Sequence, residues 1–252
     1  MAQLAPETLI TIANFPITNT LLDTLAVDVL LIGSVVWLKK HMAIIPNKFQ
    51  NLMEYVIDSF YNLTESISGK NAPAIFPFFM SFFLFILIGN WLGLFPGFGT
   101  VGFFEHVEGK TELVPLLRNF TSDFNATFAL ALISLVSTHI LAIRAIGVGQ
   151  YLGRYFSLNP VMLFVGILEI ISEITKVISL SFRLFGNIFA GEIVLSTVSN
   201  LFAFVFPVPF LLLETIVGLV QALVFSMLTM AFMSILMTPH HAEEHAKEVS
   251  HS

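Results

Sequence analysis

Five charged side chains stand inside an otherwise apolar stretch of this chain, and they are the residues whose types could do chemistry. The stretch covers residues 160–196, and its charges are Glu169, Glu173, Lys176, Arg183 and Glu192. Most of the other positions hold Leu, Ile, Val or Phe, with a periodicity that predicts one helix. Charges at membrane depth are costly, and they face a partner, a water-filled cavity or an ion path. The pattern therefore favours a functional role for these side chains.

Helical geometry places the charges on different sides of the predicted helix. At about 100° per residue, Glu192 comes out about 180° away from Arg183, and Glu173 lies further round on the arginine's side. Gly186 and Ala190 flank Arg183, so a second helix could approach this face closely. The residues within about 40° of Arg183 are Glu169, Ser172, Lys176, Ser179, Asn187 and Ala190.

A buried ion pair that holds a helix bundle together is the alternative interpretation of such charges. It does not explain Arg183, because no acidic residue stands three or four positions away from it. We therefore predict a functional role for Arg183.

Residues 179–192 read SLSFRLFGNIFAGE. This run resembles the signature of subunit a of the F-type ATP synthase, the stator part of its proton channel. The resemblance is densest over 160–238 and is supported by residues 89–96 and by Asp123, Asn125 and Thr127. It implies two offset aqueous half-channels that carry protons to and from a rotating c ring. Ion flow would thereby be coupled to rotation and ATP synthesis.

The resemblance also implies roles for residues around the arginine. Arg183 would face the c ring and separate the half-channels, with Asn187 as its neighbour one turn on. Gln221 matches a glutamine of the last helix that lies near the arginine. A guanidinium suits this role because it stays protonated, whereas a buried lysine could lose its proton.

Four acids complete the expected path for protons. Glu192 would serve one half-channel, and Glu169 and Glu173 fit the polar lining of the other. Glu214 stands where some family members have histidine, so a relay of two carboxylates would replace a histidine relay. Antiparallel helices joined by a short turn would bring Glu192 and Glu214 side by side.

Composition agrees with a membrane protein of one domain, covering residues 1–252. The chain is 56% hydrophobic and 11% charged, against about 25% charged residues in soluble domains. The net charge of −6 and the lack of a basic stripe exclude nucleic acid as a partner. The sequence has no cysteine, no HExxH or GxSxG motif and no Gly-rich phosphate loop. We therefore expect no enzymatic activity, cofactor, metal or nucleotide here, and ATP chemistry would belong to other subunits.

The fold expected from the sequence is an all-α integral membrane protein. A secondary ion transporter with a midplane charged site is the alternative function, but such a transporter should show two repeated halves, and the sequence shows none. Lys39, Lys40, His41 and Lys48 would place the end of the first span in the cytoplasm and the N-terminus outside. Asn90 is expected to form a helix-to-helix hydrogen bond. The expected elements are a span at 17–38, an amphipathic surface helix at 47–66, a hairpin of spans at 75–95 and 125–143 around an external loop at 97–123, long tilted channel helices at 160–196 and 210–238, and a polar tail at 239–252.

The partners implied by the resemblance are the c-ring subunits, the peripheral-stalk subunit b, the other ATP synthase subunits and the lipid bilayer. The expected location is a bacterial plasma (inner) membrane, with several spans, and an organelle inner membrane is the alternative.

Overall fold

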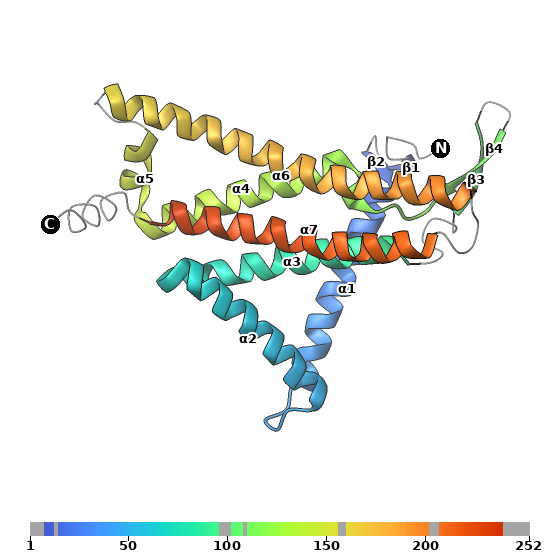
Figure 1. Cartoon of the computed structure of the whole chain (residues 1–252), viewed down its shortest axis with the longest axis horizontal. Helices are drawn as coiled ribbons and strands as arrows, with labels where there is room; N and C mark the ends of the chain where they lie inside the picture. The colour runs from blue at the N-terminus through green and yellow to red at the C-terminus, as the bar shows by residue number, and fades with distance from the viewer. Residues whose placement is uncertain are drawn as a thin grey trace. The chain divides into compact units, whose positions relative to one another are not determined.

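A computed structural model describes residues 8–12, 15–95, 102–107, 110–155, 160–201 and 207–238. The described chain is dominated by helices, which confirms the all-α class (Figure 1). The long helices are α1 (Asn19–His41), α2 (Lys48–Ser68), α3 (Ala72–Gly93), α4 (Phe124–Ile146), α6 (Pro160–Leu201) and α7 (Pro207–Leu236). A short helix, α5 (Val148–Tyr155), and two 3-10 turns, η1 (Gly69–Asn71) and η2 (Phe120–Ser122), complete the helical set.

The helix boundaries differ from the expected ones by a few residues. Helix α3 begins at Ala72 rather than at residue 75, and α6 continues to Leu201 rather than ending at residue 196. Helix α7 begins at Pro207, which is a favourable first residue because proline has no N–H to leave unpaired. The expected polar tail at 239–252 lies outside the described residues.

Two short antiparallel hairpins accompany the helices. Strand β1 (Thr8–Ile12) pairs with β2 (Phe15–Thr18), and β3 (Gly102–Val107) pairs with β4 (Lys110–Pro115). The second hairpin lies inside the expected loop at 97–123. Both hairpins pair residues that are close in sequence, so they form without changing the helical class of the chain.

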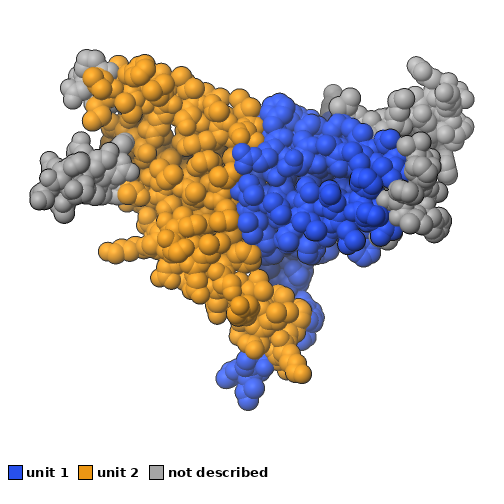
Figure 2. All heavy atoms as spheres, in the orientation of Figure 1, with its two compact units in different colours: residues 1–46, 81–129, 181–225 blue, residues 47–80, 130–180, 226–252 orange. Residues whose placement is uncertain are grey.

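The chain divides into two compact units, coloured separately in Figure 2. Unit 1 contains residues 1–46, 81–129 and 181–225, and unit 2 contains residues 47–80, 130–180 and 226–252. Helices α3, α4, α6 and α7 each contribute one part to each unit.

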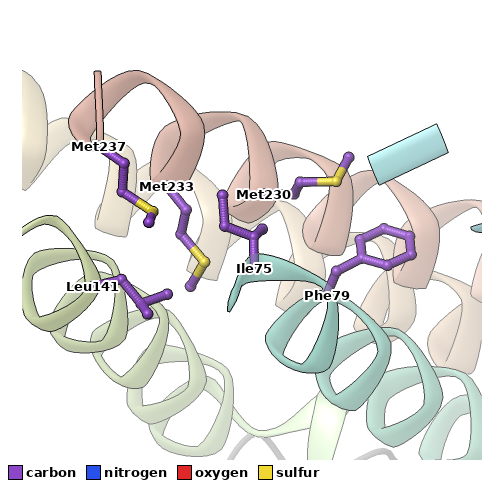
Figure 3. Close-up of a cluster of buried hydrophobic side chains, with 6 residues drawn as sticks. All are labelled: Ile75, Phe79, Leu141, Met230, Met233 and Met237. Atoms are coloured by element: carbon purple, nitrogen blue, oxygen red, sulfur yellow. The ribbon is translucent and has the colours of Figure 1, made fainter. Parts of the chain in front are cut away.

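Unit 2 is built on a cluster of apolar side chains from three helices (Figure 3). Met230 and Met233 of α7, and Met237 directly after it, pack against Ile75 and Phe79 of α3 and Leu141 of α4, and all six are buried. Inside a bilayer, helices associate by van der Waals packing because lipid tails are as apolar as these side chains. Unbranched methionine suits this contact because it fills irregular gaps.

Unit 1 contains close aromatic packing around Phe120 in η2. The rings of Phe85 and Phe120 have centroids 4.8 Å apart. Gly89, one turn from Phe85, lets the Phe120 ring approach α3, because a Cβ atom at this position would collide with the ring. The missing side chain of Gly89 therefore determines where η2 sits.

Four helical stretches of the described chain are long and apolar enough to cross a membrane. They are Asn19–His41, Lys48–Gly93, Phe124–Ile146 and Pro207–Leu236. Helix α6 is not among them, and its five charges distinguish it from the others.

Candidate proton-translocation site

Helix α6 carries six of the polar and charged residues that the sequence singled out. It is a continuous α-helix of 42 residues, which at 1.5 Å per residue is about 63 Å long. The hydrocarbon core of a bilayer is about 30 Å thick. Glu169, Glu173 and Lys176 belong to unit 2, whereas Arg183, Asn187 and Glu192 belong to unit 1.

One face of α6 in unit 1 is exposed around Arg183. Arg183, Gly186, Asn187 and Ala190 are all exposed, and no atom of the chain lies within 4 Å of a Cβ built on Gly186. The far side of the helix is buried, with Ser181 and Leu184 at 0% and Ile188 at 3% exposure. This face therefore has the room for a second helix that Gly186 and Ala190 predicted.

Asn187 joins α6 to α7 on the edge of this face. Its side-chain amide donates a hydrogen bond to the Gln221 carbonyl oxygen, and the two atoms are 2.8 Å apart. Gln221 is buried, with 4% of its surface exposed. The structure thus holds Gln221 against the residue one turn beyond Arg183.

Glu192 and Glu214 lie close together in unit 1. The Glu214 carboxyl group occupies the space beside Gly191, where a Cβ atom would be 2.8 Å from Glu214 Oε1. Glu214 is 8% exposed, and the charge of Glu192 acts on it. Glu192 Oε2 is buried without a hydrogen-bond partner among the described residues. The predicted proximity of these two acids is therefore confirmed.

Both acids of α6 in unit 2 are paired with cations instead. Glu169 Oε1 lies 2.5 Å from Arg154 Nε, and the two side chains are 16% and 13% exposed. Glu173 Oε1 lies 2.8 Å from Lys176 Nζ. The ammonium group of Lys176 also lies over the Phe232 ring, 4.6 Å from its centroid.

A small cavity of about 20 Å³ adjoins the Glu173–Lys176 pair in unit 2. Ser134 and Thr138 of α4 line it together with the ion pair, and apolar residues complete its wall. A buried water needs about 10–15 Å³ and polar partners. The cavity therefore has room for a water molecule beside the carboxylate.

Helix α5 contacts both α4 and α6 in unit 2. Gly147, with φ of +83°, lets the chain turn sharply between α4 and α5. Tyr151 Oη then lies 2.8 Å from His139 Nδ1, so His139 is a satisfied packing residue. Burial raises the pKa of the Tyr155 hydroxyl well above its usual value near 10. Tyr155 therefore stays neutral.

Two glycines and one arginine of the site were not recognised from the sequence. Gly191 makes room for the Glu214 carboxyl group, and Gly166 makes room for the backbone carbonyl of Tyr155. Arg154 pairs with Glu169, fifteen positions further along the chain. The only sequence signal for these contacts is a small residue within three positions of an acid, which is too common to be specific.

The described helices and their buried polar side chains define a multi-pass membrane protein with ionisable groups inside it. Comparison with known families matches residues 21–234 to the ATP synthase A chain. The chain is also 28% identical, over 240 residues, to the ATP synthase subunit a of Moorella thermoacetica, covering 95% of this chain and 100% of that protein.

This protein belongs to the ATP synthase A chain family. Its function is that of the stator subunit a of an F-type ATP synthase, which conducts protons within the ATP synthase complex.

Proposed function

We propose that the seven polar residues predicted from the sequence divide the work of proton translocation. Arg183, Asn187 and Gln221 form the barrier between two half-channels, Glu192 and Glu214 carry protons in one, and Glu169 and Glu173 line the other. The chain itself has no catalytic role, and nucleotides bind to other subunits.

The exposed α6 face around Arg183 is the observation that supports this proposal. A permanent cation beside Gly186, on an exposed face with open space at the glycine, fits a helix from another subunit. A carboxylate of the c ring that arrives opposite Arg183 gives up its proton, because the guanidinium stabilises the ionised acid. Protons cannot leak past Arg183 because the guanidinium does not release its own.

The Asn187–Gln221 hydrogen bond supports the assignment of these two residues to the barrier. It fixes an amide pair one turn from the arginine, and both side chains then remain in place while the ring moves. The length of α6, about 63 Å, supports a strongly tilted orientation against the ring.

We infer the partners from membership of the complex. The c ring covers the Arg183 face, the peripheral-stalk subunit b and the other subunits hold the chain in place, and the bilayer surrounds the remaining apolar helices. The location is the plasma membrane of a bacterium, since the similar protein comes from Moorella thermoacetica.

Cross-linking tests the central claim because the chain has no cysteine of its own. With a cysteine on the facing helix of the ring subunit, Gly186→Cys and Ala190→Cys are expected to form disulfides in assembled complexes. Leu184→Cys, on the buried face, is the matched control and is expected to form none. Equal cross-linking from both faces would contradict the assignment of the Arg183 face to the ring.

A further inference from the structure

Asp23 is a buried carboxylic acid that the roles assigned above do not use. It lies on α1 in unit 1 and has 0% of its surface exposed. One of its oxygens, Oδ2, accepts a hydrogen bond from the backbone N–H of Phe120, with an N–O distance of 2.8 Å. The other oxygen, Oδ1, has no hydrogen-bond partner among the described residues.

A second unpartnered oxygen lies on the same face of α1. Asn19 is the first residue of the helix and stands four positions before Asp23, so the two side chains are neighbours. Asn19 is 1% exposed, and its Oδ1 also has no partner in the described chain. Two buried acceptor oxygens thus follow one another inward from the N-terminal end of α1.

A proton bound to Asp23 would give both unpartnered oxygens, Asp23 Oδ1 and Asn19 Oδ1, a role in a hydrogen bond. A charged carboxylate with one donor is costly to bury, and binding a proton neutralises it. The resulting O–H group can donate to the Asn19 side-chain oxygen, one turn away. The group is therefore suited to hold a proton and to release it when water reaches Oδ1.

Hydrogen bonds connect the segment that holds Asp23 with the helix that carries Glu214. Phe120, which Asp23 binds, is followed by Thr121, whose hydroxyl donates to Asn90 Oδ1 at 2.8 Å. The amide nitrogen of Asn90 donates in turn to the carbonyl oxygen of Gly218 at 3.1 Å. Gly218 lies one turn beyond Glu214 on α7, so η2 and Asn90 link the segment that binds Asp23 to the helix that carries Glu214, all within unit 1.

The neighbouring aspartate is held differently. Asp123 Oδ2 accepts a hydrogen bond from the Thr20 hydroxyl, and Asp123 Oδ1 accepts one from the backbone N–H of Asn125. Both of its oxygens have donors, so Asp123 is an anchor for the start of α4. Asp23 differs because it is fully buried and one of its oxygens has no donor among the described residues.

We propose that Asp23 is a further proton-carrying residue, at the outer entrance of the half-channel that Glu192 and Glu214 serve. This inference rests on the proposed function. A proton from external water binds Oδ1 of the carboxylate and later leaves from the same atom, which restores the carboxylate. The backbone of η2 and the Asn90 side chain position the group without carrying protons themselves.

Asp23→Asn tests the proposal, because asparagine keeps the volume and an acceptor for the Phe120 N–H but cannot take up the proton. The assay is passive proton conduction through vesicles that carry the assembled membrane sector, normalised to the amount of the chain present. We expect conduction to fall about tenfold or more, since a positioned acid or base contributes roughly 10²–10⁴ to proton-transfer steps. Asp28→Asn removes a partly buried carboxyl group from the same helix and is expected to conduct normally.

A relocated carboxyl group provides the second variant. In Asn19→Asp/Asp23→Asn the acid moves one turn along the same buried face, and we expect it to restore part of the conduction lost in Asp23→Asn. Asp23→Asn that conducts at the unmodified rate would overturn the proposal. Failure of both variants to assemble would also overturn it, because Asp23 would then be an anchor for η2.

Glu192→Gln, measured in the same vesicles, separates this inference from the function on which it rests. Lost conduction in Glu192→Gln with normal conduction in Asp23→Asn removes only Asp23 from the path. Normal conduction in Glu192→Gln removes the relay itself, whatever the behaviour of Asp23→Asn.

Discussion

The acids of α6 have opposite kinds of neighbours in the two units. In unit 2, Glu169 and Glu173 each lie within ion-pairing distance of a cation, Arg154 and Lys176. In unit 1, Glu192 lies beside another acid, Glu214, in a space opened by Gly191. Four carboxyl groups of the same chemical type are thus placed in two different electrostatic environments.

This difference indicates what each pair of acids can do. An opposite charge stabilises the ionised form of an acid, so Glu169 and Glu173 are suited to remain charged and to orient water and helices. Two close carboxyl groups cannot both ionise readily, so Glu192 and Glu214 are suited to share and exchange a proton. We infer that the first pair lines a path, whereas the second pair carries the protons.

Arg183 stands between the two sets on α6, ten positions after Glu173 and nine before Glu192. Replacing it is expected to have the largest effect, because it would separate one set from the other. We expect Arg183→Ala and Arg183→Lys to assemble but to abolish coupled ATP synthesis, since a buried lysine can lose its proton. The measurement is ATP-driven proton pumping in vesicles, and near-normal pumping in Arg183→Lys would disprove the separator role.

Replacing either acid of the Glu192–Glu214 pair in unit 1 is expected to have the next largest effect on proton conduction. We expect Glu192→Gln to assemble and to slow passive proton conduction by roughly 10²-fold, the lower end of the range for acid–base steps. Glu214→Gln should be less harmful, and Glu214→His should conduct better than Glu214→Gln because histidine can exchange a proton. Loss of assembly in both glutamine variants would show that the pair only clamps the hairpin of α6 and α7.

Much of this comparison could be predicted from the sequence, and the reasons differ between residues. Glu192 and Glu214 flank a proline-containing turn, so their proximity followed from helix geometry, and Asn90 was correctly expected to join two helices. The sequence could not show that Arg154 pairs with Glu169, because the turn at Gly147 and the docking of α5 decide it. Nor could the sequence show that Asp23 is completely buried. The burial of Asp23 depends on the packing of η2 against α1, and no local sequence pattern predicts that packing.

The ion pair of unit 2 predicts an effect on stability rather than on conduction. Arg154→Gln leaves Glu169 charged in a mostly buried position, and removing one partner of a buried pair costs about 3 kcal/mol. The double variant Arg154→Gln/Glu169→Gln should be more stable than Arg154→Gln alone, because no buried charge is left. Thermal unfolding of the purified complex in detergent measures this order, and the reverse order would contradict the pairing.

The smallest effects are expected for two glycine substitutions, Gly166→Ala in unit 2 and Gly191→Ala in unit 1. In unit 2, a Cβ atom at Gly166 would collide with the backbone carbonyl of Tyr155, which cannot move without shifting α5. We expect Gly166→Ala to destabilise the protein by about 1–3 kcal/mol, the usual range for overpacking. In unit 1, the corresponding atom at Gly191 would meet only the end of the Glu214 side chain, at 2.8 Å. Gly191→Ala should therefore leave stability nearly unchanged.

Conduction should show the opposite order for the same two variants. Gly191→Ala would push the Glu214 carboxyl group away from its position beside Glu192, and we expect it to slow proton conduction several-fold, within the roughly 10²-fold loss expected for the acid itself. Gly33→Ala on α1, where no atom lies within 4 Å of the added carbon, is the matched control for both measurements. If Gly191→Ala conducted normally, the space beside Gly191 would not be needed to position the Glu214 carboxyl group, and the two glycines would differ only in packing.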